Sequence, residues 1–281
     1  MSNFLAGLRA EFGKVTTTRL WWILAIVLFA YIALTAGGLG ALFGAISTGK
    51  IGASAGTGGA GAAGGRGLDF GALGPLVYSF ATSIGYVFPV LLGALATTGE
   101  FRHQTLTPTF LANPRRLQVL GAKSVSSLIV GAAYGVVALV AAVGAGALAL
   151  SALGIDTALG DSDTWAMFGR ALITMALWAA IGVGLGTLVP NQTAAIVIIL
   201  AFTQFLEPLL RLAGGLSDVT ASVAKFLPGA SSDALVGKSF FTISNPAASS
   251  LDWWQGGLVL LGYAVTFTVA GYLVTWRKDV T

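Results

Sequence analysis

The chain has 281 residues, of which 56% are hydrophobic and only 9% are charged, with a net charge of +4. A soluble globular protein carries about 25% charged residues, so this chain has too few charges to cover a surface that faces water. Most of its surface must therefore face lipid. The sequence contains no cysteine, which excludes disulfides and thiolate metal sites.

Residues 1–19 predict an amphipathic helix that lies on the membrane surface before the first span. Apolar residues recur there at helical spacing, and charged residues occupy the other face. The apolar stretch that follows is far longer than the roughly 7–15 residues of a signal-peptide core, so we expect this start to be retained. Aromatic rings favour the headgroup level of a membrane. The residues expected to anchor this segment at the interface are Phe4, Leu8, Phe12, Trp21 and Trp22.

Six later apolar runs are long enough to cross a bilayer, which takes about 20 residues each. The predicted fold is therefore an all-α membrane protein, with a six-span domain over residues 20–281 that follows an interfacial elbow helix. The predicted spans are Leu20–Gly44, Leu73–Thr97, Leu117–Ala152, Trp165–Val189, Ala194–Leu212 and Leu258–Trp276.

Local signals refine two of these spans. Pro89 should kink the second span, because proline removes a helical hydrogen bond and clashes with the preceding turn. Asn113 and Pro114 predict the start of the third helix, since Asn is a favoured cap and Pro fits the first helical position. The third run is too long for the bilayer alone, so we expect its Lys123 end to project into water.

Charge placement predicts the orientation. With six crossings both termini share one side, and that side holds nine of the 15 basic residues but only three of the 11 acidic ones. An excess of Lys and Arg marks the cytoplasmic side, so both termini are predicted to be cytoplasmic in a plasma membrane. The outer segments are then residues 47–70, 155–164 and 213–254, and the last of these contains two predicted short helices, Val219–Leu227 and Ala230–Phe241.

Residues 99–116 form a polar island between two apolar runs, with the sequence GEFRHQTLTPTFLANPRR. The island includes the chain's one histidine, His103, and is longer than the roughly 2–8 residues that usually join two packed helices. Charges stand at both ends, with apolar residues such as Phe101 and Leu106 between them. This composition is typical of a short helix pressed against a partner outside the membrane, and we predict that helix over Glu100–Thr107.

Glu207 is the one carboxylate that the pattern places well inside a span, close to Gln204. A buried charge costs at least about 2.5–3.5 kcal/mol on insertion scales, which favours a functional role. Glu207 and Gln204 could line a transport path, or Glu207 could pair across a subunit interface. Alternatively, Glu207 could lie near the outer end and reach the interface, or pair with Arg211 four residues later, which is a favoured spacing.

Sequence motifs for catalysis are missing. One histidine in an aqueous loop cannot supply a metal triad, and a Ser–His dyad has no support. Gly237-Lys238-Ser239 resembles the tail of a phosphate-binding loop, but position 232 is Ser where that loop requires Gly. The chain is therefore predicted to be no enzyme and to bind neither a metal nor a cofactor of its own.

The chain resembles the membrane subunit of bacterial type-2 ATP-binding-cassette exporters, in the branch common in actinobacteria. The likeness covers nearly the full length and rests on LRAEFGKVTTTRLWW, GEFRHQTLTPTFLANPRRLQVLGAK, LEPLL, FLPGASSDAL and WRKDVT, in that order. It implies a dimer of permease subunits with two cytoplasmic ATPase subunits on separate chains, which would hold ATP and Mg. It also implies that the island is the ATPase-coupling segment. The residues expected to carry the coupling are Glu100, Phe101, Arg102, His103, Gln104, Thr105, Leu106 and Thr107.

The expected function is ATP-driven export of a hydrophobic or amphipathic compound, such as a drug, antibiotic, peptide or lipid-like molecule. The spans are lined mostly by apolar residues, which favours a cargo taken from the membrane, and no nucleic-acid partner is expected. The alternative is a secondary transporter or channel-like protein that works without an ATPase. A secondary transporter should show two related halves and coupling carboxylates near the midplane, and the sequence offers one candidate acid. A purely structural anchor would not need the island.

Overall fold

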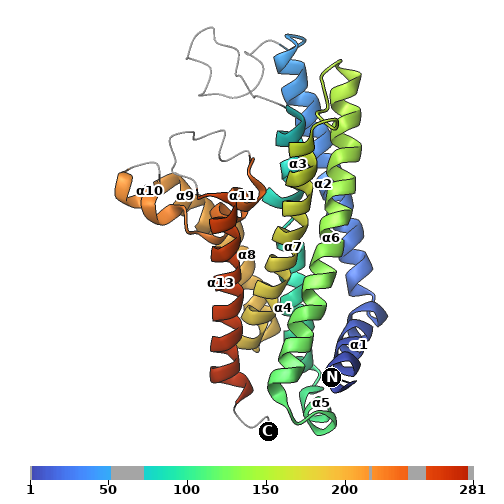
Figure 1. The fold of residues 1–281 in the computed structure, drawn as a ribbon, viewed down its shortest axis with the longest axis vertical. Coiled ribbons are helices and arrows are strands. Elements are labelled where there is room, and N and C mark those ends of the chain that lie inside the picture. The colour runs from blue at the N-terminus through green and yellow to red at the C-terminus, as the bar shows by residue number, and fades with distance from the viewer. Residues whose placement is uncertain (1, 52–72, 215–216, 240–250, 278–281) are drawn as a thin grey trace.

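The computed structural model describes residues 2–51, 73–214, 217–239 and 251–277, and in these ranges it contains helices and no strands (Figure 1). The N-terminal helix α1 spans Ser2–Thr17, and the first two spans are α2 (Leu20–Ser47) and the broken pair α3 (Leu73–Ser83) and α4 (Val87–Arg102). A short α5 (Leu106–Ala112) precedes α6 (Arg116–Ala152) and α7 (Ser162–Leu188). The predicted all-α fold is confirmed.

The last two spans each contain a π-helical turn. The fifth span runs through α8 (Gln192–Ala201), η1 (Phe202–Leu206) and α9 (Glu207–Gly214), and the sixth through α13 (Trp253–Gly271) and η2 (Tyr272–Trp276). Between them lie the short helices α10 (Asp218–Ala224) and α11 (Pro228–Val236). Two short helices were predicted in this segment, and both are present with shifted bounds. Most of the predicted outer segment 47–70 lies outside the described residues.

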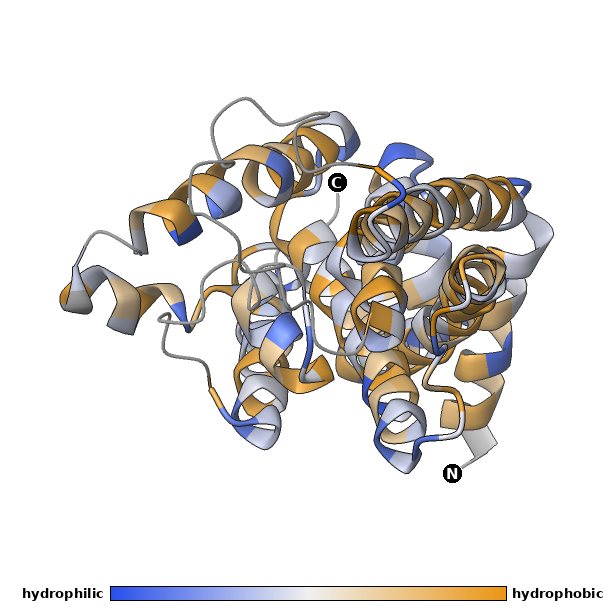
Figure 2. Ribbon diagram, turned by 90° about the horizontal axis from the view of Figure 1, so that it is seen from above, coloured by the Kyte–Doolittle hydropathy of each residue, from blue (hydrophilic) through white to orange (hydrophobic). Residues whose placement is uncertain are grey.

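Six helical stretches are long and apolar enough to cross a membrane, which confirms the predicted spans and makes the chain a multi-pass membrane protein. Helix α7 is central, because it packs against α4, α6 and α13. Of the residues in its most apolar 18-residue stretch, 72% are buried inside the protein. The corresponding share is 22% for α2 and 17% for the sixth span. In the view along the bundle, hydrophobic residues cover the outward faces of the helices as well as the interior (Figure 2). Lipid is the solvent that suits such outward faces.

The second span is broken at residues 84–86, which form turns between α3 and α4. Pro89 lies one turn further on and has no backbone N–H to bond to the carbonyl of Gly85, which instead accepts from Phe88 N at 3.1 Å. The helix is therefore distorted just before Pro89, in agreement with the predicted kink, although Ile84 N and Tyr86 N still donate to the carbonyls of Phe80 and Thr82 at 3.3 Å each.

Close helix contacts in the core depend on glycine. Gly182 on α7 faces α4, where an added Cβ would collide with the carbonyl oxygen of Val90, and Gly131 on α6 lies within contact of Ala179 and Met175 on α7. Small residues allow helix backbones to approach closely in lipid, where apolar packing has no hydrophobic driving force. These contacts hold α4, α6 and α7 together as one packed unit.

Helices α1 and α5 and the end of η2 lie at one end of the bundle, which we call the α1 end, and the opposite end is the far end (Figure 1). Helix α6 begins at this α1 end, at Arg116, two residues later than predicted from Asn113 and Pro114. Asn113 instead ends α5, and its Oδ1 accepts a hydrogen bond from Arg115 N at 3.2 Å. The asparagine thus shapes the loop before α6 and does not cap the helix.

Candidate functional site

The polar island folds differently from the helix predicted over Glu100–Thr107. Helix α4 continues to Arg102, a turn covers residues 103–105, and α5 begins at Leu106. Gln104 has φ +53°, a left-handed conformation that interrupts the helix. Pro108 is tolerated in the first turn of α5, whereas in a helix continuous with α4 its ring would clash with the carbonyl of Gln104, so a new helix begins at Leu106.

Helix α5 is attached to the bundle along one face. Leu106 is buried in a small apolar cluster with Val119 and Leu120 of α6, Val183 of α7 and Trp276 of η2. This cluster connects α5 to three transmembrane elements at once. A displacement of α5 would therefore be passed directly to α6, α7 and the sixth span.

An aromatic contact fixes the other end of the same face. The Phe110 ring packs edge-on against Trp276 with centroids 5.4 Å apart, and the Arg116 guanidinium lies 4.9 Å over the Phe110 ring. Arg116 Nη1 also donates a hydrogen bond to the carbonyl of Trp276 at 2.6 Å. Aromatic and cation–π contacts of this kind are each worth roughly 0.5–1.5 kcal/mol, so α5 is firmly attached.

The opposite face of this segment is open. Most of the predicted coupling residues are exposed there, namely Arg102, His103, Gln104, Thr105 and Thr107, while Phe101 is half-buried. Leu111 on α5 is 82% exposed, the largest exposed fraction among the exposed large hydrophobic residues of the described chain. Arg102 Nη1 donates to Gln192 Oε1 at 3.1 Å, which connects the end of α4 to the start of α8. The segment thus exposes an apolar side chain, Leu111, together with polar and basic ones.

Glu100 and Lys123 do not lie where the sequence predicted. Glu100 is 5% exposed and Lys123 is 2% exposed, and with buried Glu11 and the more exposed Lys14 they form what we call the four-charge cluster. Lys123 Nζ lies 2.5 Å from Glu11 Oε2 and 3.2 Å from Glu100 Oε1, so it does not project into water. Glu100, in turn, faces inward and is not available to a partner.

The four-charge cluster joins three helices. Lys14 Nζ on α1 donates to Glu11 and to Glu100 at 2.6 Å each, so α1 is held against α4 and α6 by charge. Burial alone would raise the pKa of Glu11, but the Lys123 and Lys14 ammonium groups hold this pKa below its ordinary value. Burial would likewise lower the pKa of Lys14, but Glu100 and Glu11 raise it above its ordinary value. Glu11 and Lys14 are therefore both charged at neutral pH.

The predicted interface anchors flank this cluster on α1 and the start of α2. Phe4 and Leu8 are half-buried, while Phe12 and Trp22 are exposed. Trp21 is half-buried against the core, and its Nε1 donates to the carbonyl of Thr16 at 2.9 Å. The exposed aromatic rings at the α1–α2 junction agree with an interfacial position for α1.

The structure places the two candidate path residues in different environments. Glu207 is 1% exposed, whereas Gln204 is exposed on the outward side of η1. Glu207 Oε1 lies 3.1 Å from Arg211 Nη2 and accepts a hydrogen bond from Gly229 N at 2.5 Å. The alternative pairing with Arg211 is thus confirmed, and a role for either residue in a transport path stays a prediction.

Asp233 completes this second cluster, which sequence reasoning missed. Arg211 Nη1 lies 2.6 Å from Asp233 Oδ2, and Ser83 Oγ at the break of the second span donates to Asp233 Oδ1 at 3.1 Å. We call Glu207, Arg211 and Asp233 the Arg211 triad. It fastens α9 to α11 and to the end of α3, over sequence separations of 22 and 150 residues.

Within the described ranges, no group of three or more His, Cys, Asp or Glu residues is arranged to hold a metal ion. Searches against known proteins add nothing to this picture: no protein-family model matches the chain, and no curated protein matches it.

Proposed function

We propose that this chain is the transmembrane subunit of an ATP-driven exporter for a hydrophobic or amphipathic compound. In this proposal two cytoplasmic ATPase subunits on separate chains bind ATP and Mg and supply the free energy. The chain pairs with a second permease subunit, hydrolyses nothing itself, and provides the path across the plasma membrane. The α1 end is then cytoplasmic, as the distribution of basic residues favours.

The observation that carries the proposal is the two-sided character of α5. One face is fixed to α6, α7 and η2 through Leu106, Phe110 and Trp276, and the other presents the exposed Leu111. A helix that only connected two spans would have no need to expose a leucine in the aqueous phase. A docked ATPase would bury it, and movement of the ATPase would then act on three transmembrane elements.

Fewer of the predicted coupling residues are available for contact with the ATPase than the sequence suggested. Glu100 and Leu106 are buried, so in the revised proposal they support the segment from inside. The exposed residues that remain for the ATPase contact are Arg102, His103, Gln104, Thr105, Thr107 and Leu111. The basic and polar groups would surround an apolar centre, the arrangement that protein interfaces commonly have.

The alternative function, a secondary transporter or channel-like protein without an ATPase, would place its coupling groups within the spans. The charges that lie buried or nearly buried in the described spans are Glu100, Lys123, Glu207 and Arg211, and each of them is already in an ion pair. The two-sided α5 therefore favours the ATP-driven exporter.

Replacing Leu111 with Ser should reduce the amount of ATPase that co-purifies with the chain by roughly tenfold, as expected for loss of a central apolar interface contact. The measurement is the ratio of ATPase to permease after purification from native membranes, together with the ATP hydrolysis rate of the complex. Leu212→Ser is the matched control, because Leu212 is also highly exposed, at 74%, but lies on α9. Equal recovery of an ATPase with the wild type and the Leu111 variant would contradict the proposed contact.

The orientation can be tested separately, because the chain has no cysteine and a single introduced one is unique. His103→Cys should react with a membrane-impermeant maleimide only after the cells are opened, since His103 is exposed at the α1 end. Lys50→Cys, just beyond α2 at the far end, should react in intact cells. Labelling of position 103 from outside would eliminate the ATPase contact together with the proposed topology.

A further inference from the structure

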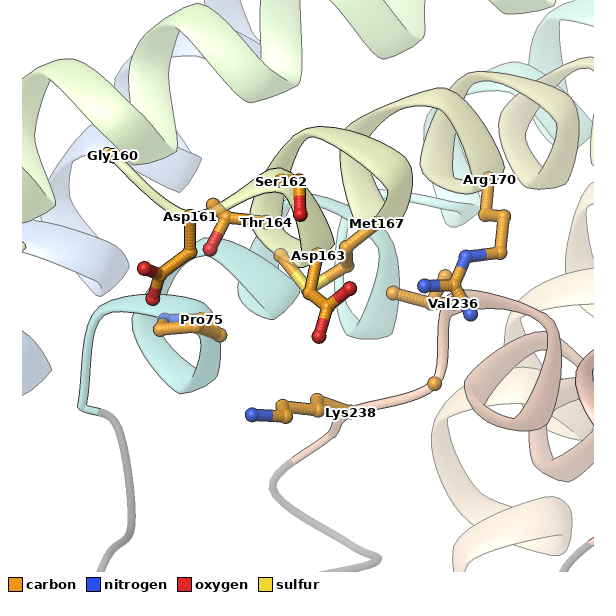
Figure 3. A pocket seen from close by; sticks show the side chains of 11 residues that line it. Pro75, Gly160, Asp161, Ser162, Asp163, Thr164, Met167, Arg170, Val236 and Lys238 are labelled. Carbon is orange, nitrogen blue, oxygen red and sulfur yellow. The ribbon is translucent and has the colours of Figure 1, made fainter. Parts of the chain in front are cut away.

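A hollow of about 650 Å³ lies in the far half of the bundle, between the start of α7 and the residues that follow α11 (Figure 3). Asp161 and Asp163 line it from the α7 side, Arg170 reaches it from two turns further along α7, and Lys238 lines it after α11. Figure 3 shows both carboxylates directed away from α7, with the Lys238 chain extended below them. The volume falls in the range of roughly 300–1,000 Å³ that small-molecule sites occupy.

No described charged residue neutralises the four charged side chains. Across the described part of the chain, none of them makes an ion pair with another charged residue. Asp161 holds the N-cap position of α7 without making a side-chain cap hydrogen bond, although Asp is a favoured cap. Opposite charges that share a hollow without pairing leave room for a ligand between them.

The backbone leaves space for the cation at the edge of the hollow. Gly237 ends α11 with φ +95°, and an added Cβ there would lie 3.1 Å from Arg170 Nη1. Within the described residues, Arg170 forms its hydrogen bond through Nε, which donates to the carbonyl of Ala166 at 3.3 Å. The terminal nitrogens of the guanidinium therefore remain for a bound group.

Thr164 adds a hydroxyl to the lining of the same hollow, and the residue is 3% exposed. Its hydroxyl oxygen is not among the described buried side-chain atoms that lack a hydrogen-bond partner. In the hollow this hydroxyl can bond to water or to a bound ligand.

The depth of the hollow in the membrane indicates the kind of molecule that reaches it. Trp165 on α7 and the pair Trp253 and Trp254 at the start of α13 are all exposed. Tryptophan is enriched at the headgroup level, and these residues begin the fourth and sixth spans at the far end. The hollow therefore lies at the depth of polar headgroups and is open to amphiphiles.

We propose that this hollow binds a ligand that carries an ammonium group and an oxyanion a few bonds apart, as a phosphoethanolamine group does. Asp161 and Asp163 receive the ammonium, Arg170 and Lys238 receive the oxyanion, and Thr164 donates a hydrogen bond to it. Two acids and two bases disfavour a ligand with one kind of charge, because one pair repels whatever the other attracts. Charge-assisted hydrogen bonds at both ends favour a zwitterion. The site does not depend on the exporter proposal.

The test is calorimetric titration of the full chain in detergent micelles with glycerophosphoethanolamine, which has both charged groups and no acyl chain. We expect it to bind about tenfold more tightly than ethanolamine or inorganic phosphate alone, and Asp163→Asn and Lys238→Gln each to weaken it about tenfold. Both residues are exposed, so neither substitution should disturb folding. Lys50→Gln, an exposed lysine outside the hollow, is the matched control and should leave the Kd unchanged.

Nanodiscs distinguish a lipid headgroup from a soluble zwitterion as the source of the ligand. If the natural occupant is a lipid, discs containing phosphatidylethanolamine should weaken soluble-probe binding relative to discs of phosphatidylglycerol alone. If binding is equal in both, the site takes its zwitterion from water. The proposal is overturned if inorganic phosphate alone binds as tightly as the zwitterion, if Asp163→Asn and Lys238→Gln leave the Kd unchanged, or if no probe binds.

Discussion

Replacing Lys123 with Met should lower the free energy of unfolding by about 3 kcal/mol, the lower end of the cost of removing one partner from a buried ion pair. Lys123 and its partners Glu11 and Glu100 are all at least nine-tenths buried, so the substitution leaves two carboxylates in a site that excludes water. Lys14 remains beside both of them and keeps the loss from being larger. Unfolding in micelles, followed by tryptophan fluorescence, measures the change.

Lys14→Met is the matched control for this prediction. Its side chain is 41% exposed, so water screens its contacts, and its loss should cost only about 0–1 kcal/mol. In the double variant Glu11→Gln with Lys123→Met, one of the two stranded charges is removed and part of the stability should return. A Lys123 variant that is no less stable than the Lys14 variant would show that the four-charge cluster does not hold α1 in place.

The position of Lys123 shows where sequence reasoning reached its limit. Apolar runs and helical spacing are local properties, so the spans and α1 could be predicted from the sequence. The length of the third run suggested that Lys123 extends into water, but its partner Glu11 lies 112 residues earlier. The spacing of Glu11 and Lys14 was visible as a helical pair, yet nothing local indicated that α1 packs against α4 and α6.

The candidate coupling segment could likewise be predicted only in part, because the sequence shows its local properties but not its long-range contacts. Its excess length, mixed composition and location were readable from the sequence, and a short helix is indeed present. Its register was wrong, because Pro108 and the left-handed Gln104 move the start of the helix to Leu106. The attachment to Trp276 could not be predicted, because that residue lies more than 160 residues further along the chain and only the tertiary fold brings it to Phe110.

Taken with the exporter proposal, the two charge clusters define what the second span can do. At the α1 end, Glu100 fixes the end of α4 to α1 and α6. At the break before α4, Ser83 is bonded to Asp233 of the Arg211 triad. The half of the span between these points, α4, packs closely against α7 through Gly182. A force on α5 would therefore be carried along α4 and α7 to the break, where the chain can change direction without breaking a regular helix.

Replacing Arg211 with Met should destabilise the protein more than the Lys123 substitution does, by about 4 kcal/mol. The side chain of Arg211 is 14% exposed and lies between Glu207 and Asp233, whose side chains are 1% and 6% exposed. No lysine or second arginine joins the triad in the described ion pairs, so the substitution leaves two buried acids facing each other. Chemical unfolding in micelles measures the loss, and α11 should detach from α9 first because the triad is their charged link.

Adding Asp233→Asn to Arg211→Met separates lost attraction from new repulsion. The amide keeps the acceptor for Ser83 and removes one of the two stranded charges, so the double variant should recover roughly 1–2 kcal/mol of the loss. Arg211→Lys should lie between the wild type and Arg211→Met, because lysine restores the charge but cannot bridge both carboxylates with a planar fork. If Arg211→Met and the wild type unfold at the same denaturant concentration, the triad does not fasten α9 to α11. Of the two charged attachments described for the second span, the one that Glu100 makes at the α1 end would then remain.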